Sequence, residues 1–174
     1  MKLLYSIHKY DVFMFTWLIN ARMHANLTTA GRYLSKTGDG YLYLIIMGLL
    51  YWRDGLESPT LQAILLAFLI ERPIYFVLKN GLRRNRPQAA LQNFRSHITP
   101  SDKFSFPSGH TSAAFMMATL LGYYLPPLMI LFYCWATLVA FSRVVLGVHF
   151  PTDTLVGAIL GISTALFSLG QIVI

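Results

Sequence analysis

Long apolar runs separated by short polar intervals are the dominant pattern of the chain. Most of the runs approach the ~20 residues that a helix needs to cross the hydrocarbon core of a bilayer. They end at Pro, Gly or charged residues, which commonly terminate helices. The pattern therefore predicts five membrane-spanning helices. We expect them at residues 41–52, 61–78, 108–125, 128–146 and 153–172.

The N-terminal part follows a weaker pattern. Residues 11–20 are apolar but too short to span a bilayer, and Arg22 and His24 follow them. This favours an amphipathic helix over residues 9–24 that lies in the membrane interface, with a sixth span as the alternative. Residues 25–36 are predicted to form a helical lead-in to the first span, which Gly38-Asp39-Gly40 interrupts or kinks.

The predicted fold is therefore an all-α integral membrane protein, a bundle of five to six transmembrane helices with an N-terminal amphipathic helix. We expect one domain over residues 1–174, in which residues 1–36 form the amphipathic, interfacial part. If the spans alternate in direction, the ends of the second and fourth meet the starts of the third and fifth. Lys79, Ser108, Arg143 and His149 then gather at one membrane face.

Composition supports a membrane protein and limits the classes of partner that it is expected to bind. Only 12% of the residues are charged, against about 25% in soluble domains. The net charge is +7, and six of the 14 Lys and Arg residues lie between Lys79 and Lys103. A basic cluster can bind nucleic acid, anionic headgroups or a phosphorylated substrate. In a small membrane protein we expect the bilayer and a lipid phosphate as partners and no nucleic acid, whereas the oligomeric state stays open.

Cys134 is the only cysteine, so neither a disulfide framework nor a cysteine metal site is expected. The first nine residues lack the apolar core and small-residue cleavage site of a signal peptide. We therefore expect the N-terminus to be retained.

The polar interval from Lys79 to His110 resembles an anion-binding site. Its basic residues precede Pro107-Ser108-Gly109-His110, where a helix is predicted to begin. The first turn of a helix leaves backbone N–H groups unpaired, and these groups attract anions. Lys79, Arg86 and Arg143 would form the phosphate clamp, because fixed cations offset the charge that phosphoryl transfer spreads over oxygen atoms.

His149 and Asp153 have the spacing of a histidine–carboxylate pair. A helix that begins near Pro151 would bring them onto one face and place Asp153 in its first turn. A carboxylate that accepts the N–H of one imidazole nitrogen fixes the tautomer and leaves the other nitrogen free to attack. The alternative is a purely structural hydrogen bond.

Three motifs in order carry a family resemblance: Lys79-x6-Arg86-Pro87, Pro107-Ser108-Gly109-His110 and Ser142-Arg143-x5-His149-x3-Asp153. Together they resemble the signature of the type-2 phosphatidic acid phosphatases, a family that includes the vanadium haloperoxidases and the glucose-6-phosphatases. The resemblance covers residues 79–153, and every signature position matches.

The resemblance implies a role for each motif residue. His149 would be the nucleophile that forms a phospho-histidine, and His110 the general acid for the leaving group and a base for the attacking water. Ser108 would be a helix N-cap or would contact a phosphate oxygen, and the Gly109 N–H would donate to the phosphoryl group. No metal or cofactor is implied.

Charged residues outside the motifs are predicted to have other roles. Arg83 and Arg84 lie in the spacer of the first motif and are expected to face solvent or headgroups rather than bind phosphate directly. Glu71-Arg72 falls inside a predicted span, where charges are costly. We expect a pairing with another helix, or a place in the substrate cavity as the alternative. Gly157 and Gly161 predict a close helix-packing face.

The leading hypothesis is a metal-independent membrane phosphatase that acts on undecaprenyl diphosphate, phosphatidic acid or phosphatidylglycerol phosphate. A lipid phosphotransferase that uses the same phospho-histidine is the alternative. A metal-dependent hydrolase and a non-enzymatic channel or scaffold are weaker alternatives. No His-Glu-x-x-His or comparable set of metal ligands in the sequence supports a metal-dependent hydrolase.

The orientation signals conflict. Positive residues on the catalytic side would place that side in the cytoplasm, whereas the family resemblance implies a bacterial inner membrane with the active site on the periplasmic face. We adopt the periplasmic orientation, because the basic residues have a catalytic reason for their position.

Overall fold

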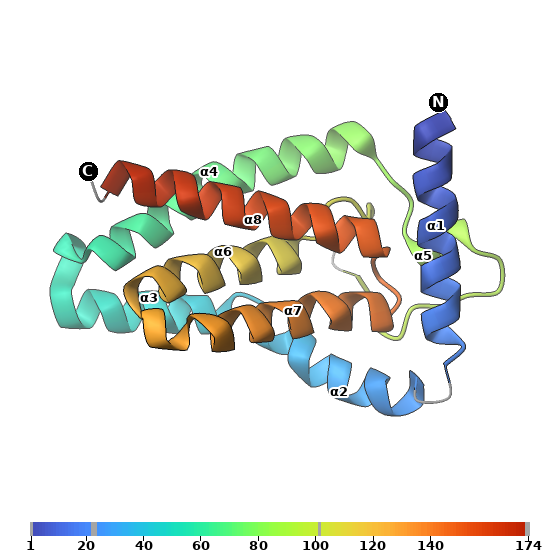
Figure 1. Ribbon diagram of the computed structural model, residues 1–174, viewed down its shortest axis with the longest axis horizontal. Coiled ribbons are helices and arrows are strands. Elements are labelled where there is room, and N and C mark those ends of the chain that lie inside the picture. The colour runs from blue at the N-terminus through green and yellow to red at the C-terminus, as the bar shows by residue number, and fades with distance from the viewer. Residues whose placement is uncertain (1, 22–23, 101, 173–174) are drawn as a thin grey trace.

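The structure is a computed structural model that describes residues 2–21, 24–100 and 102–172 (Figure 1). In chain order its α-helices are α1 (Lys2–Ile19), α2 (His24–Thr37), α3 (Tyr41–Asp54), α4 (Pro59–Leu82), α5 (Pro87–Ala90), α6 (Gly109–Tyr124), α7 (Met129–Val145) and α8 (Pro151–Ile172). Two 3₁₀ turns, Gly55–Glu57 and Pro126–Leu128, precede α4 and α7.

Figure 1 shows α4, α6, α7 and α8 running along the length of the molecule, with α1 crossing one end of this bundle. Each of the five predicted spans corresponds to one helix, from α3 to α8 without the short α5. Three segments within the described residues are long and apolar enough to cross a membrane: Pro59–Leu82, Pro126–Val145 and Pro151–Ile172. At 14 and 16 residues, α3 and α6 are shorter than these.

The N-terminal helix differs from the prediction in its bounds. It begins at Lys2 rather than near residue 9 and ends at Ile19 rather than residue 24, because Asn20 and Ala21 form a turn. Residues 22–23 lie outside the described part of the chain. The predicted break at Gly38–Gly40 is confirmed, since α2 ends at Thr37 and Gly40 has a φ of 92° before α3 begins.

Helix α6 lies at the centre of the bundle, where it packs against α4, α7 and α8. The contact with α8 is close because Gly157 and Gly161 face α6: a Cβ at Gly161 would lie 2.1 Å from the Ser112 carbonyl oxygen. The predicted small-residue packing face is therefore confirmed. The outer surface of the bundle stays apolar, as a lipid-facing surface does. Leu69 and Ile130 are 71% and 79% exposed.

Glu71 connects α4 to α6 within the bundle. Its side chain is fully buried, accepts a hydrogen bond of 2.6 Å from the Ser112 hydroxyl and forms an ion pair with Arg72. A buried carboxylate needs such partners. The predicted pairing of this charged segment with another helix is confirmed, and Arg72 also lines the cavity described below.

Candidate active site

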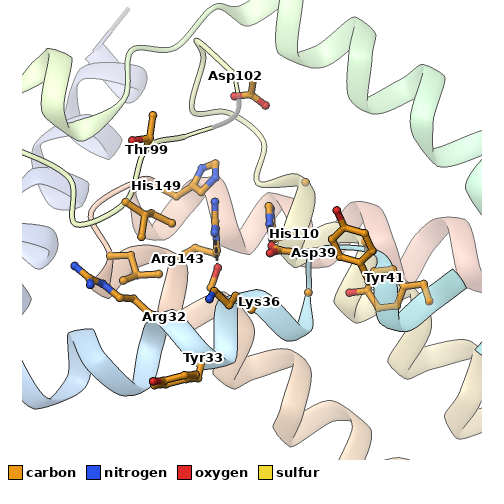
Figure 2. Close-up of a pocket in the computed structure, with 18 of the residues that line it drawn as sticks. Arg32, Tyr33, Lys36, Asp39, Tyr41, Thr99, Asp102, His110, Arg143 and His149 are labelled. Carbon is orange, nitrogen blue, oxygen red and sulfur yellow. Dashed lines mark hydrogen bonds and ion pairs between the residues drawn. The ribbon is translucent and has the colours of Figure 1, made fainter. Parts of the chain in front are cut away.

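A cavity of about 1140 Å³ opens at the end of the bundle where α4 and α7 end and α6 begins (Figure 2). Its walls bring together residues from all three sequence motifs. They are Lys79, Arg86, Gly109, His110, Arg143 and His149. Ser108 and Asp153 are fully buried behind this surface. The convergence that the alternating spans predicted is therefore present.

His149 lies in the turn between α7 and α8, with 2% of its side chain exposed. Its Nδ1 is 3.7 Å from Oδ2 of Asp153, which is longer than a hydrogen bond, and Nδ1 has no hydrogen-bond partner among the described residues. The backbone N–H of Phe150 donates to the same Oδ2 at 2.8 Å and so holds the carboxylate beside the ring. Helix α8 begins at Pro151, as predicted.

Burial keeps the imidazole of His149 neutral. It lowers the pKa of His149 to about 3, because the cost of desolvating the charged ring exceeds the opposing attraction of Asp153. A neutral imidazole has a free lone pair on one nitrogen. Because Asp153 faces Nδ1, the free lone pair belongs on Nε2.

Arg84 holds the other oxygen of Asp153. Its guanidinium donates to Asp153 Oδ1 at 2.7 Å and to Asp11 Oδ2 at 2.6 Å, and only 21% of its side chain is exposed. The expectation that Arg84 faces solvent or headgroups is therefore wrong, because two buried carboxylates attract it. Its neighbour Arg83 is exposed, as expected.

Asp11 extends this network to the N-terminal helix. Its carboxylate is 1% exposed and accepts from the backbone N–H of Thr152 at 3.0 Å, in addition to Arg84. Thr152 also accepts from Arg84 through its hydroxyl at 2.8 Å. Helix α1 is thus attached to the first turn of α8, which carries Asp153.

Lys79 and Arg86 share one carboxylate. Asp102 lies 3.1 Å from Lys79 Nζ through Oδ2 and forms an ion pair with Arg86 through Oδ1. The Tyr75 hydroxyl donates to Oδ2 at 3.0 Å. Partial burial raises the pKa of Asp102, but Lys79 and Arg86 outweigh burial and hold it below its usual value. Asp102 therefore stays ionised between the two cations.

The backbone fixes both of these cations in place. Arg86 donates to the Val148 carbonyl at 2.6 Å, directly before His149, and Lys79 donates to the Pro107 carbonyl at 3.3 Å. Each bond ties a cation of the first motif to the backbone of another motif.

Arg143 reaches the cavity from the last turn of α7, with 4% of the residue exposed. Its Nη1 donates to the Ser35 hydroxyl of α2, and its buried Nε has no hydrogen-bond partner among the described residues. The preceding Ser142 instead donates to the Val139 carbonyl within its own helix at 2.6 Å. Arg143 therefore lines the cavity and forms no ion pair with a carboxylate among the described residues.

His110 pairs with an acid that the motifs do not contain. Its Nε2 is 2.7 Å from Asp39 Oδ1, and Asp39 lies in the break between α2 and α3. An ionised carboxylate can only accept a hydrogen bond, so Nε2 of His110 carries the hydrogen. Figure 2 shows His110 and His149 with Arg143 between them.

Ser108 occupies the N-cap position of α6 but does not cap the helix through its side chain. Its hydroxyl instead accepts from the Thr111 hydroxyl at 2.9 Å, and its N–H donates to the Asp153 carbonyl at 2.9 Å. Gly109 follows at a point of close approach, since a Cβ there would lie 3.0 Å from the Tyr75 ring. A larger residue would press on this cavity wall.

Comparison with known proteins identifies the family. The family model described as the PAP2 superfamily matches residues 60–173. The chain belongs to the PAP2 superfamily. Two relatives are the bacitracin transport permease protein BcrC of Bacillus licheniformis, 30% identical over 129 residues, and phosphatidylglycerophosphatase B of Bacillus subtilis, 33% identical over 132 residues. These matches cover 72% and 70% of the chain and 64% and 61% of the relatives, so less than two thirds of either relative is spanned.

Two solved structures share the fold of this PAP2 chain. LpxE of Aquifex aeolicus superposes with a TM-score of 0.80 at 28% identity, covering 91% of the chain and 94% of LpxE. The transmembrane PAP2-type phosphatidylglycerolphosphate phosphatase of Bacillus subtilis superposes with a TM-score of 0.74 at 29% identity. The match covers 95% of this chain and 86% of the Bacillus subtilis chain. With its three membrane-compatible helices, this PAP2 chain is an integral membrane protein.

Sequence reasoning missed Ser35, Asp39 and Asp102, which contact motif residues of this PAP2 site, and Asp11, which is linked to Asp153 through Arg84. Two of them had a usable signal. Asp102 is an acid in a basic loop, and Asp39 lies between two glycines at the predicted break. Asp11 and Ser35 lie in the part predicted to be interfacial, with no spacing that relates them to a motif.

Within the described residues, no group of three His, Cys, Asp or Glu side chains is placed to hold a metal ion.

Proposed function

We propose that the protein is a membrane phosphatase that removes a phosphoryl group from a lipid phosphate or diphosphate through a phospho-histidine. One observation carries the proposal. His149 is buried and neutral beside Asp153, and its cavity is flanked by Lys79, Arg86 and Arg143. This arrangement combines a nucleophile with fixed positive charge, as phosphoryl transfer requires.

In the first step, His149 Nε2 attacks phosphorus and the bond from phosphorus to the leaving oxygen breaks. His110 donates a proton to that oxygen, which becomes the lipid alcohol, or the lipid monophosphate when the substrate is a diphosphate. Lys79, Arg86 and Arg143 stabilise the negative charge on the phosphoryl oxygens. Asp153 balances the positive charge that develops on the ring of His149.

In the second step, water attacks the phospho-histidine and the bond from phosphorus to Nε2 breaks. His110, which gave up a proton in the first step, accepts one from the water. Inorganic phosphate leaves and neutral His149 is restored. A lipid alcohol in place of water would make the same intermediate a phosphotransferase.

The names of the relatives support a lipid substrate. Phosphatidylglycerophosphatase B is one, and a decaprenylphosphoryl-5-phosphoribose phosphatase of Mycobacterium tuberculosis, 32% identical over 96 residues, is another. Undecaprenyl diphosphate, phosphatidic acid and phosphatidylglycerol phosphate are therefore the substrates we propose to test. We place the protein in a bacterial inner membrane with its cavity on the periplasmic face, where a lipid tail can stay in the bilayer.

Phosphate release by the purified full chain tests the proposal, with these three lipids, a chelator and no added acceptor lipid. We expect inorganic phosphate, and an acid-labile phosphoenzyme after rapid quenching with labelled substrate. His149→Ala should lower the rate by roughly 10³-fold or more and abolish the phosphoenzyme while the protein stays folded. Normal turnover by this variant would refute the nucleophile, loss of activity with the chelator would indicate a metal enzyme, and release only with an acceptor would indicate transfer.

A further inference from the structure

Helix α2 presents two cations to the cavity that belong to none of the three motifs. Arg32 and Lys36 both line it and are four residues apart, so they share one face of the helix (Figure 2). Like charges at this spacing repel each other and destabilise the helix. A bound anion would reverse this cost.

Positive charge on the cavity wall exceeds what its acids neutralise. Six Lys and Arg residues line the cavity, against the two carboxylates of Asp39 and Asp102. Asp102 is bound by Lys79 and Arg86, and Asp39 is bound by His110. Neither acid pairs with the cations of α2.

The Lys36 ammonium has no hydrogen-bond or ion-pair partner among the residues that the structure describes. Arg32 donates from Nη2 to the His97 carbonyl at 3.1 Å and has no carboxylate partner among the described residues. Arg72, the other cation outside the motifs, is already paired with Glu71. The unneutralised charge outside the clamp therefore lies on α2.

This charge lies next to the proposed phosphate clamp. Ser35, between Arg32 and Lys36 in sequence, accepts a hydrogen bond from Arg143 of the clamp. Helix α2 thus meets the clamp at Ser35 and places Arg32 and Lys36 on the adjoining wall. An anion held there would be a neighbour of the reacting phosphorus, within the same substrate headgroup.

We propose that Arg32 and Lys36 form a second phosphate subsite, which binds the phosphate of the substrate that is not transferred. The inference rests on the proposed phosphatase function and specifies its substrate class: lipids whose headgroup carries two phosphates. The second phosphate has two possible sources. It is the prenyl-linked phosphate of a prenyl diphosphate, or the phosphodiester of phosphatidylglycerol phosphate.

Four lipids separate these cases: a prenyl diphosphate and its monophosphate with the same tail, and phosphatidylglycerol phosphate and phosphatidic acid with the same acyl chains. Lys36→Gln should raise KM about 10-fold for the two-phosphate lipid whose second phosphate binds this subsite, since a charged hydrogen bond contributes about 1.5 kcal/mol. The KM for the matching monophosphate should change less than about 3-fold, and kcat should stay within the same factor. For a lipid that is not turned over, the inhibition constant replaces KM.

Three variants control the measurement. Lys36→Arg keeps the charge and should restore KM. Arg32→Gln should act like Lys36→Gln. Arg95→Gln removes a charge from an exposed loop position outside the cavity and should change nothing.

A rise in KM that is confined to the prenyl diphosphate or to phosphatidylglycerol phosphate supports the subsite and identifies the source of the second phosphate. Equal effects on one-phosphate and two-phosphate lipids, or no effect of Lys36→Gln, overturn the subsite and leave the phosphatase proposal intact. If the wild-type protein releases phosphate from none of the four lipids, the proposed function itself fails.

Discussion

At the scale of single residues, the protonation of His149 is the property on which the proposed chemistry depends. The ring is 2% exposed, and burial lowers its pKa to about 3. A nucleophile that is neutral throughout the physiological range needs no proton removed before it attacks. Asp153 and Arg84 then act on a neutral ring that becomes charged only during the reaction.

This burial predicts a pH dependence of stability. The folded-state pKa of about 3 lies below the unfolded value of about 6.5, so the unfolded state binds more protons between these limits. Stability contributed by neutral His149 is thus present above about pH 6.5 and is lost as the pH falls towards 3. The loss approaches about 1.4 kcal/mol per pH unit. His149→Gln should remove this component.

Unfolding of wild type and His149→Gln in detergent between pH 7 and 4 measures the effect. The titrating groups that do not interact with His149 are common to both proteins and cancel in the difference. We expect the variant to gain stability relative to wild type as the pH falls. Parallel curves would show that His149 is not held in its neutral form by burial.

At the scale of elements, the N-terminal helix is connected to the first turn of α8 through Arg84. This side chain joins Asp11 of α1 to Asp153 of α8, while Asp11 also accepts from the Thr152 N–H. Arg84 does not face the cavity, so its effect on the reaction passes through the position of Asp153. It is a positioning residue.

Arg84→Gln should lower kcat about 10- to 100-fold with little change in KM, and should destabilise the protein by about 2 kcal/mol because two buried carboxylates lose their cation. The figure is below that of a fully buried pair, since the Arg84 side chain is 21% exposed. Arg83→Gln is the matched control, because Arg83 is adjacent in sequence but exposed. Equal effects of the two variants would contradict this role for Arg84.

The contact between α6 and α8 predicts a second effect at this scale. Gly161→Ala would place a methyl group 2.1 Å from the Ser112 carbonyl oxygen, so we expect a loss of about 1–3 kcal/mol in unfolding free energy. Gly170→Ala in the same helix meets no described atom within 4 Å and should be neutral or slightly stabilising. Thermal unfolding in detergent compares the two, and a Gly161→Ala protein as stable as wild type would argue against the close packing.

At the scale of the whole molecule, every residue of the candidate site lies at one end of the bundle. Helices α4 and α7 end there, α6 and α8 begin there, and α1 crosses the same end (Figure 1). The cavity therefore opens on one side of the membrane. Which side it is decides the pool of lipid headgroups that the protein can reach.

Cysteine labelling tests the proposed periplasmic orientation. Cys134 is the only cysteine, so a Cys134→Ser background permits a single reporter at the exposed Gln92 of the polar loop. Gln92→Cys should react with a membrane-impermeant maleimide in intact cells. Reaction only after the inner membrane is permeabilised would place the cavity in the cytoplasm.

The helices after residue 40, and the motif residues at their ends, follow from the sequence alone. Apolar runs of spanning length and Pro or Gly breaks are local features, so α4, α6, α7 and α8 begin and end within a few residues of their predicted bounds. The His149–Asp153 spacing is equally local. Alternation of the spans then required the motif residues to meet, and the cavity brings them together.

The partners of those residues depend on how the helices pack together. Asp11 and Arg84 are 73 positions apart in the chain, His110 and Asp39 are 71 apart, and Arg143 and Ser35 are 108 apart. Such pairs form because buried charges require partners wherever the packed helices supply them. No periodicity or spacing encodes that choice, which is why the sequence predicts a solvent-facing Arg84 and does not relate the cations of α2 to the cavity.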